Sequence, residues 1–527
     1  MRQWLSQRAE TSPTACALID AETGDHYTFA ALDQAVEQLA GRLIALGVSK
    51  GDRLGIVLSP RVESVFTLYA AARIGATAVP LGHRLTATEI ETRLTRAMVQ
   101  TIICGRGTEK TVFEATTALE ESISVISLDT STVDSVDAID TVETATSTGV
   151  NAATWDSQQR QLLLFTSGTT GSPKAVTLTA GNILWSAISS AFRLGVDPNE
   201  RWLVTLPLHH MGGIAPILRS PLYGMTVVLR GEFDAEQAVA DIHQYDITAV
   251  SLVPTMLRRI LNSVDEPSVL EILRAVLLGG APAPATLINR CQDESIPVCP
   301  TYGLTETASQ VATARPRTAF NNPETVGAPL LWNDVTIVDE SGSPQPAGDP
   351  GEIVIDGPTV TPGYAGPHTI AKGTYGFHTG DIGVLDTDGR LTVVNRLDDR
   401  IITGGENVDP GEVTAVLESH PEVAAAAVVG IPDTEWGERV VAAVTPLTEE
   451  TVSKDDLRSH ARTHLAGFKI PKEIQVVETL SRTVSGTIDR DAIRELFITD
   501  TTVTPEDEQS ESSAAMTGDN TDHSSDS

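Results

Sequence analysis

The strongest constraint on the fold is an alternation of helical and strand patterns over the first 300 residues. Between Thr28, a candidate helix N-cap, and Gly47, a candidate terminator, apolar residues recur at the 3.6-residue spacing of an amphipathic helix. Ser59 and Pro60 predict the start of another helix, with proline at its first position. Apolar runs lie between such segments, at 54–58, 101–104, 226–229, 250–253 and 275–278. Strands of this kind are buried on both faces, so we predict an α/β fold in which helices cover parallel sheets.

The pattern changes towards the C-terminus. Short strands separated by Gly, Pro and Asp predict a small β-rich subdomain at 330–395, within a large N-terminal domain of residues 1–396. After a break at 396–400 we expect a small α+β domain at 397–500, with helices at 411–419, 454–465 and 489–496 and strands at 423–429 and 440–444. Residues 501–527 contain seven acidic and no basic residues, so we predict a disordered tail.

The charge balance excludes two classes of partner. The chain has 37 Lys and Arg against 70 Asp and Glu, a formal net charge of -33. Such a surface repels phosphate backbones and anionic lipid, so we expect neither nucleic-acid binding nor membrane insertion. Only 7 of the basic residues are Lys. This composition favours a halophilic protein, because concentrated salt screens the repulsion between carboxylates.

The cysteines and the N-terminus indicate a cytoplasmic protein. Cys16, Cys104, Cys291 and Cys299 are scattered, without the spacing of a zinc site, so we expect reduced, buried thiols. The N-terminal residues lack the apolar segment of a signal peptide, and no run reaches the roughly 18 apolar residues of a membrane span.

One segment carries a clear chemical signal. An apolar strand at 161–165 leads directly into a run composed only of Thr, Ser and Gly, followed by Pro173 and Lys174. Glycines let the backbone approach an anion, hydroxyls and amides donate hydrogen bonds to it, and the lysine supplies charge. The segment is not a Walker A loop, because no Ser or Thr follows Lys174. We interpret it as a phosphate-binding loop of Thr166, Ser167, Gly168, Thr169, Thr170, Gly171, Ser172, Pro173 and Lys174.

This loop, with further motifs in the same order, resembles the adenylate-forming acyl-CoA synthetases over residues 1 to about 497. The resemblance implies that 166–174 hold the phosphates of ATP and that Gly279, Gly280, Ala281 and Pro282 form the adenine side of the site. It also implies that Tyr302 stacks on adenine beside Gly303, that Thr305 contacts phosphate, that Glu306 holds Mg²⁺, and that Asp381, with Arg396 beside it, binds the ribose. On residue type alone, Glu306 could be a solvated carboxylate and Asp381 a turn residue.

The resemblance also implies that the break at 396–400 is a hinge between two domains. In this family a small C-terminal domain rotates between two half-reactions, and Asp398 matches the hinge position. Carboxylate and MgATP first give acyl-adenylate and pyrophosphate, and the thiol of CoA then attacks the adenylate. Gly404 and Gly405 resemble the loop beside the pantetheine tunnel, and Trp436 is expected near bound CoA.

The chain departs from the family at one position. Thr487 stands where the family carries a catalytic lysine near the C-terminus. Losing such a donor typically costs about 10²–10³-fold in rate. We expect Arg490, about one helical turn further on, to compensate, with Arg482, Lys469 and Lys472 as other candidate cations.

Two segments narrow the acid substrate. Residues 305–313 and 218–225 resemble the o-succinylbenzoate:CoA ligases of menaquinone biosynthesis more closely than fatty-acid relatives. A dicarboxylate needs a polar or cationic group for its second carboxylate, and Arg219, Ser309 and Gln310 are chemically suited. Arg219 could instead be a surface cation. His210 aligns with the residue that lines the acyl pocket, although His209 and His210 could be packing residues.

Three alternatives to an o-succinylbenzoate:CoA ligase remain. A medium-chain or aryl acyl-CoA synthetase would share every ATP motif. A peptide-synthetase adenylation domain would be followed by a carrier domain, whereas this chain ends in an acidic tail. Thr487 also leaves open a non-catalytic acyl-adenylate or nucleotide-binding protein. We therefore expect ATP, Mg²⁺, CoA and a carboxylic acid as ligands, and a homo-oligomer is possible.

Overall fold

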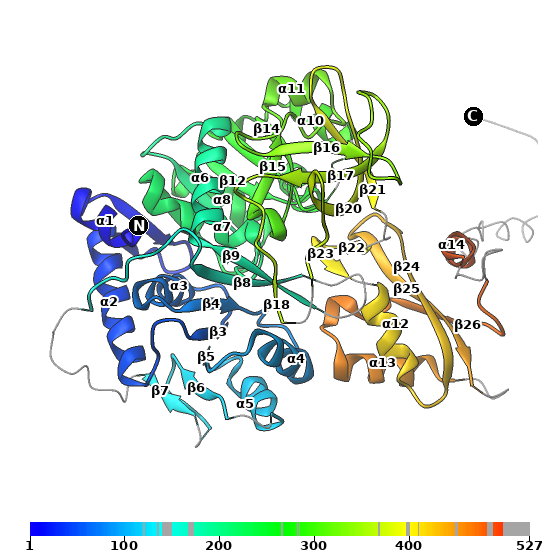
Figure 1. The fold of residues 1–527 in the computed structure, drawn as a ribbon, viewed down its shortest axis with the longest axis horizontal. Coiled ribbons are helices and arrows are strands. Elements are labelled where there is room, and N and C mark those ends of the chain that lie inside the picture. The colour runs from blue at the N-terminus through cyan, green and yellow to red at the C-terminus, as the bar shows by residue number, and fades with distance from the viewer. Residues whose placement is uncertain are drawn as a thin grey trace, which may run out of the picture.

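The structure is a computed structural model of the 527-residue chain. It describes residues 1–119, 122–133, 136–139, 150–166, 173–264, 267–281, 283, 285–366, 369–396, 401–408, 410–447, 452–481 and 489–498. We use "N-terminal unit" for the described residues up to 396 and "C-terminal unit" for those from 401 onward. In Figure 1 the C-terminal unit, in yellow to orange, lies to one side of the larger N-terminal unit.

The first of two eight-stranded sheets in the N-terminal unit has a parallel centre. Its strand order is β15 (Ser309–Thr313), β14 (Val298–Leu304), β13 (Ala275–Leu278), β12 (Ala249–Leu252), β10 (Arg201–Val204), β11 (Thr226–Leu229), β1 (Cys16–Asp20) and β2 (His26–Thr28). Only the edge strands β15 and β2 are antiparallel to their neighbours. Every residue of β11, β12 and β13 is buried, as expected for strands covered on both faces.

The second eight-stranded sheet is built similarly. Its order is β18 (Tyr364–Ala365), β9 (Lys174–Thr179), β8 (Arg160–Thr166), β4 (Thr77–Pro80), β3 (Arg53–Val57), β5 (Thr101–Cys104), β6 (Ser124–Ser127) and β7 (Asp137–Ala138). The pairs from β8 to β7 are parallel, whereas β9 runs antiparallel to both β8 and β18. The β8–β9 hairpin therefore sits near one edge of this sheet.

Helices cover both sheets. One apolar core combines residues of both sheets with α2 (Phe29–Ala45), α3 (Val62–Ile74), α6 (Ala180–Leu194) and α7 (Met211–Tyr223), so these helices lie between the sheets. A second core joins the first sheet to α8 (Ala235–Gln244), α9 (Pro254–Ser263) and α10 (Ala285–Asp293), and a third joins the second sheet to α4 (Ala87–Ala97) and α5 (Glu109–Thr117). Shorter elements are α1 (Trp4–Thr11), α11 (Pro316–Asn321), η2 (Pro267–Leu270) and η3 (Thr305–Thr307).

Two smaller sheets follow. The first is antiparallel, in the order β16 (Asp334–Val338), β17 (Gly351–Asp356), β20 (Gly376–Leu385) and β19 (Lys372–Gly373), with β21 (Leu391–Arg396) also paired to β20. The sheet of the C-terminal unit has the order β23 (Glu406–Val408), β22 (Ile401–Thr403), β25 (Gly437–Pro446) and β24 (Val423–Asp433), with β26 (Glu473–Val476) on β25. Its core contains α12 (Pro410–Glu418) and α13 (Lys454–His464), with η4 (Gly467–Lys469) after α13. A separate apolar cluster holds α14 (Arg490–Ile498).

The predicted α/β fold is confirmed, and one predicted helix start is wrong. Thr28 caps α2 by accepting a hydrogen bond from the Ala31 backbone N–H. The helix expected at Ser59 and Pro60 begins only at Val62. Arg61 is held extended there, and its guanidinium donates two 3.0 Å hydrogen bonds to the Asp129 carboxylate. A tertiary ion pair thus outweighs the local proline signal.

Two further expectations concern the burial of the cysteines and the absence of a membrane-spanning helix. Cys104, Cys291 and Cys299 are buried free thiols, whereas Cys16 is partly exposed. Burial raises the pKa of Cys104, Cys291 and Cys299 to about 12, so these thiols remain protonated at neutral pH. In the part of the chain that the structure describes, no helix combines the length and apolar character needed to cross a bilayer. The predicted tail at 501–527 lies outside the described residues.

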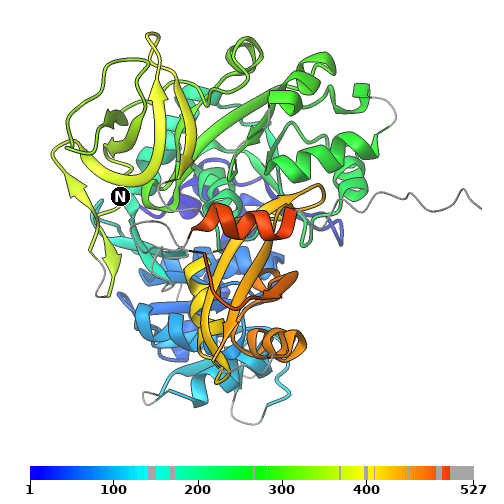
Figure 2. The ribbon, with the colours of Figure 1, turned by 90° about the vertical axis from the view of Figure 1, so that its right-hand side faces the viewer.

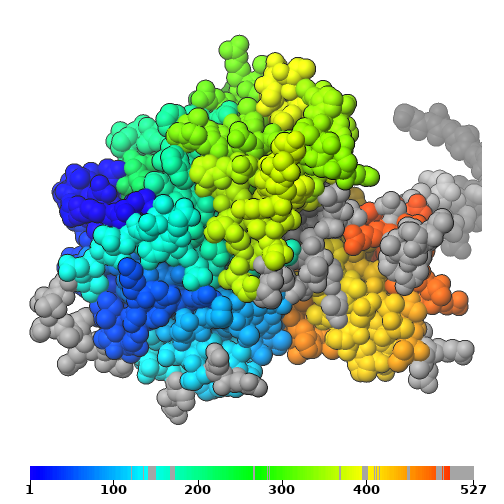
Figure 3. Space-filling view, viewed as in Figure 1, coloured from blue at the N-terminus to red at the C-terminus, as the bar shows by residue number. Residues whose placement is uncertain are grey.

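The two units meet at a buried ion cluster. Lys469 of the C-terminal unit donates 2.9 Å hydrogen bonds to Glu89 of α4 and to Glu412 of α12. The Lys469 and Glu89 side chains are each 4% exposed. Figure 2, which faces the C-terminal unit, shows it in front of the blue and cyan part of the N-terminal unit and below most of the green part, and Figure 3 shows its surface continuous with that of the N-terminal unit.

Candidate active site

The predicted phosphate loop connects the two strands of a hairpin. Strand β8 is buried along most of its length and ends at Thr166, whose backbone pairs with Lys174 at the start of β9. Ser167, Gly168, Thr169, Thr170 and Gly171 lie outside the described residues. The hairpin therefore places Thr166 and Lys174 side by side at the two ends of the loop.

A tyrosine links Lys174 to the predicted magnesium ligand. The Lys174 Nζ lies 5.6 Å from the centre of the Tyr364 ring, which is a cation–π distance. The Tyr364 hydroxyl donates a 3.1 Å hydrogen bond to Glu306 Oε1. Strand β18 holds Tyr364 in place because it pairs with β9. The lysine, the tyrosine and the carboxylate thus form one contiguous polar group.

The segment that contains Glu306 is tightly held. Glu306 and Thr305 lie in η3, between β14 and β15, and Glu306 is 8% exposed. The Glu306 backbone carbonyl accepts a 2.7 Å hydrogen bond from the Thr361 N–H. The alternative that Glu306 is a freely solvated carboxylate is therefore wrong. A buried carboxylate oriented by a hydroxyl offers the oxygen ligands that a hard divalent cation such as Mg²⁺ prefers.

The predicted adenine and ribose residues are in direct contact. The Tyr302 hydroxyl donates a 2.7 Å hydrogen bond to Asp381 Oδ2. Asp381 lies in β20, is 2% exposed and pairs through its backbone with Arg396 of β21. Gly280 and Ala281 follow β13 and Gly303 lies in β14, the neighbouring strand; Pro282 is outside the described residues. Loops after adjacent parallel strands meet at one edge of a sheet, where nucleotides bind in open α/β folds.

A histidine of the N-terminal unit contacts a glutamate of the C-terminal unit. His210, which precedes α7, lies with Nε2 3.1 Å from Glu406 Oε2 in β23. The His209 and His210 rings are 4.2 Å apart. Burial raises the pKa of Glu406 and the hydrogen bond from His210 lowers it, with a net pKa of about 2. Burial, reinforced by His210, holds the pKa of His209 well below its usual value.

The glycine pair before Glu406 is enclosed on two sides. Gly404 and Gly405 have φ values of 58° and 82°, in the left-handed region that favours glycine. A Cβ on Gly404 would lie 2.8 Å from the Trp436 ring, and a Cβ on Gly405 would lie 2.9 Å from the Val253 side chain in the N-terminal unit. Trp436 is 40% exposed. The turn therefore fits between the two units only without side chains.

Arg219 is buried among polar side chains. It lies in α7, is 4% exposed and donates hydrogen bonds of 3.1–3.2 Å to Ser186, Ser190 and the Gln310 side-chain carbonyl. The alternative that Arg219 is a surface cation is therefore wrong. Ser309, next to Gln310, has φ 109° and is partly exposed. Among the described residues, no carboxylate forms an ion pair with Arg219.

The proposed replacement for the missing lysine lies on α14 (Arg490–Ile498) of the C-terminal unit. Arg490 begins α14, whose residues Ile493 and Phe497 pack with β24 and β25. Figure 1 shows α14 on the outer side of the C-terminal unit, away from the β8–β9 hairpin. Compensation for Thr487 by Arg490 in the first half-reaction stays a prediction. Thr487, Arg482 and the hinge residue Asp398 lie outside the described residues.

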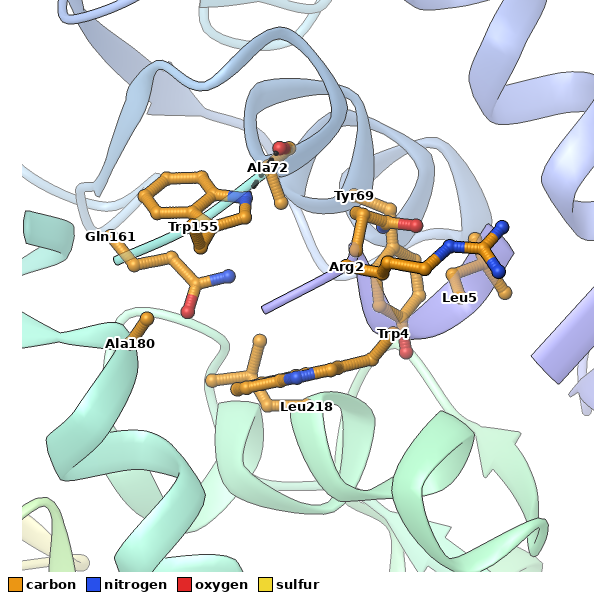
Figure 4. A pocket seen from close by; sticks show the side chains of 10 residues that line it. Arg2, Trp4, Leu5, Tyr69, Ala72, Trp155, Gln161, Ala180 and Leu218 are labelled. Carbon is orange, nitrogen blue, oxygen red and sulfur yellow. Dashed lines mark hydrogen bonds between the residues drawn. The ribbon is translucent and has the colours of Figure 1, made fainter. Parts of the chain in front are cut away.

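An enclosed cavity near the N-terminus is separate from these residues. Figure 4 shows it between Trp4, Tyr69, Trp155 and Leu218, with the Trp155 indole N–H donating to the Ala72 carbonyl. Its volume is about 20 Å³, which suits roughly one water molecule. It is far too small for a nucleotide.

The sequence analysis missed the contacts of three residues. Tyr364 lies in none of the recognised motifs, Glu406 belongs to the loop assigned to the pantetheine tunnel, and Lys469 was a candidate replacement for the missing lysine. Their partners are 58, 196 and 380 residues away in the chain, respectively. No local pattern marks such contacts.

Comparisons with known proteins identify the family of the chain. The model of the AMP-binding enzyme family matches residues 5–365, and that of the AMP-binding enzyme C-terminal domain matches residues 412–487. A 2–succinylbenzoate--CoA ligase from Bacillus licheniformis is 37% identical over 491 residues, covering 92% of this chain and 98% of the relative.

Two structures of the o-succinylbenzoate CoA synthetase from Bacillus subtilis differ in their similarity to this one. A double mutant with a bound product analogue gives a TM-score of 0.85, and the complex with the acyl-adenylate intermediate gives 0.70. Both are 33% identical and cover 94% of this chain and 98% of the relative. Since identity and coverage are equal, the parts of this structure are arranged more like those of the product-analogue complex. By sequence and by structure, the chain belongs to the AMP-binding enzyme family.

Proposed function

We propose that the protein is an acid:CoA ligase that activates 2-succinylbenzoate as its acyl-adenylate and then transfers the acyl group to CoA. The observation that carries the choice of acid is Arg219, a buried cation with only neutral hydrogen-bond partners among the described residues. The relatives named as 2-succinylbenzoate--CoA ligases support the same substrate. The product would enter menaquinone biosynthesis.

In the first half-reaction, the acid attacks the α-phosphate of ATP and pyrophosphate leaves. Lys174 and the loop that begins at Thr166 would hold the phosphates, and Glu306 would hold Mg²⁺. When bound, the ion neutralises the charge that develops on the leaving pyrophosphate. Asp381 would bind the ribose hydroxyls, and Tyr302, which donates to Asp381, would present its ring to adenine. The related enzyme from Bacillus subtilis was solved with ATP and magnesium ion, which supports both ligands.

In the second half-reaction, the CoA thiol attacks the acyl-adenylate and AMP leaves. We assign the described arrangement of the two units to this step, because it resembles the product-analogue complex more than the acyl-adenylate complex. The compact turn at Gly404 and Gly405, with Trp436 beside it, would border the path of the pantetheine arm. Asp398 would act as the hinge between the steps.

The second carboxylate of the substrate gives the specificity. A guanidinium binds a carboxylate through two parallel hydrogen bonds, and a buried one is not screened by water. Ser186, Ser190 and Gln310 position Arg219 by accepting three of its five guanidinium hydrogen bonds, so two donors remain for the carboxylate. Ser309 would donate a further hydrogen bond. A fatty acid would gain nothing from these groups.

A panel of acids tests the proposal. Purified protein in molar KCl is given MgATP and CoA with 2-succinylbenzoate, octanoate or benzoate, and thioester formation is measured by mass spectrometry. We expect thioester and AMP with 2-succinylbenzoate far above the other two acids. Equal rates with octanoate or benzoate would instead indicate a medium-chain or aryl acyl-CoA synthetase. ATP binding without CoA-dependent AMP release would indicate a non-catalytic binding protein.

A further inference from the structure

Three potential metal ligands meet where the two units touch. One ligand atom from each of His209, His210 and Glu406 lies within 4.8 Å of the other two. His210 Nε2 and Glu406 Oε2 are already 3.1 Å apart, close to the separation of two ligands on one tetrahedral ion. Two imidazoles and one carboxylate form a common zinc site that leaves the fourth position open.

We propose that His209, His210 and Glu406 form a binding site for a divalent transition-metal ion, with Zn²⁺ as its probe, and that the bound ion ties the C-terminal unit to the N-terminal unit. Imidazole ligands favour zinc and its transition-metal neighbours over Mg²⁺, which prefers oxygen. The site is therefore chemically distinct from the carboxylate at Glu306.

The three residues are only partly buried, so an ion between them can take its fourth ligand from solvent. A cavity of about 20 Å³ on one side of His209 is lined by His83 and Leu208 among mainly apolar side chains, and neither His210 nor Glu406 lines it.

The site spans two parts that must move apart. His209 and His210 precede α7 in the N-terminal unit, whereas Glu406 lies in β23 of the C-terminal unit. An ion bound by all three would oppose rotation of the C-terminal unit. We therefore expect Zn²⁺ to inhibit adenylate formation more than thioester formation from preformed acyl-adenylate. This consequence rests on the proposed function, but metal binding itself does not.

Metal binding is tested on the full chain. Chelator-treated protein is titrated with ZnCl₂ in competition with a chromogenic chelator, and bound zinc is counted after dialysis. We expect one tightly bound Zn²⁺ per chain. His209→Gln and Glu406→Gln should each weaken it by at least about 10–100-fold, the loss that follows even from removing an outer-shell partner of a metal ligand. Because the two variants lie in different units, a folding defect in one leaves the other informative.

A second histidine cluster provides the matched control. His460 lies 5.2 Å from His420 and 4.6 Å from His464, measured between ring centres, on the C-terminal unit. His460→Gln should keep the zinc affinity of the wild type. Unchanged affinity in both site variants, or loss of zinc in His460→Gln alone, would overturn the proposal. If zinc binds as expected to a protein that makes no adenylate, the proposed function fails and the metal site stands.

Discussion

At the scale of single residues, Tyr364 joins two parts of the phosphate site that its sequence neighbourhood does not connect. Its ring faces the Lys174 ammonium and its hydroxyl donates to Glu306. A hydrogen bond to a metal-binding carboxylate fixes the direction of its free oxygen. Tyr364 is therefore a positioning residue for the proposed magnesium site.

We expect Tyr364→Phe to weaken the response to Mg²⁺. The ring, and with it the contact to Lys174, remains, but Glu306 loses its hydroxyl partner. The Mg²⁺ concentration that half-saturates ATP–pyrophosphate exchange should rise about 10–100-fold, as is typical for an outer-shell partner. Tyr375→Phe is the control, since Tyr375 is 39% exposed. An unchanged Mg²⁺ dependence would show that Tyr364 does not orient the carboxylate.

A substitution of Arg219 should affect binding of the acid substrate and leave binding of ATP unchanged. Arg219→Lys keeps the charge but loses the planar fork. A hydrogen bond to a charged group contributes about 1.5–3 kcal/mol, so the KM for 2-succinylbenzoate should rise about 10–150-fold. The KM for ATP should not change. Any residual activity on octanoate, which has no second carboxylate, should also be unaffected; parallel losses on both acids would contradict the assignment.

The Glu406 carboxylate gives a pH dependence with a defined sign. Its folded pKa of about 2 is below the ordinary value of 4.5. Its contribution to stability is therefore complete above about pH 4.5 and is lost as the pH falls towards 2. The difference in unfolding free energy between wild type and Glu406→Gln, from urea denaturation, should be largest at neutral pH and shrink below pH 4.5. A difference that is constant from pH 7 to pH 3 would refute this.

At the scale of elements, α4 connects the C-terminal unit to the hairpin strands. Glu89 caps the start of α4 by accepting from the Thr86 N–H, and its second oxygen accepts from Lys469. Near the other end of the helix, Arg96 donates to the Pro173 carbonyl beside Lys174. The same helix therefore contacts the C-terminal unit near its start and one end of the phosphate loop near its other end.

Removing the Lys469 cation from the interface between the two units should lower the stability of the fold. Lys469→Met would leave the carboxylates of Glu89 and Glu412 buried without their shared cation. Breaking a buried ion pair from one side costs about 3–5 kcal/mol. The unfolding free energy should fall by about that amount. Lys472→Met, which changes an exposed lysine on the face of Trp436, should have little effect; equal losses in both variants would contradict the argument.

At the scale of the whole molecule, charge is the dominant property. A net charge of -33 makes the folded chain repel itself, and salt screens this repulsion. We expect the melting temperature to rise between 0.1 M and 1 M KCl by more than about 2–4 °C, the shift that about 1 kcal/mol produces in a domain of 150–250 residues. Sucrose at equal osmolality controls for exclusion effects. A melting temperature that is flat or falls with KCl would exclude the halophilic interpretation.

Much of the fold could be predicted, because its signals are local. The spacing of apolar residues after Thr28 and the continuous apolar runs report burial within a few residues, and the structure has α2 and parallel strands at those places. Individual boundaries shifted by about a residue, as between the run at 54–58 and β3 at Arg53–Val57. The helix start at Ser59 failed because Asp129, far along the chain, holds Arg61 extended.

The sequence by itself determined the α/β class, which follows from local spacing, and the family resemblance, which rests on short motifs in a fixed order. That resemblance in turn gives the residues predicted to bind phosphate, metal and ribose. Only the tertiary structure decided that Tyr364 joins Lys174 to Glu306, that Arg219 is buried, and that His210 meets Glu406 across the two units. Such contacts join residues tens to hundreds of positions apart, so they arise from how the sheets and units pack and leave no periodic trace in the chain.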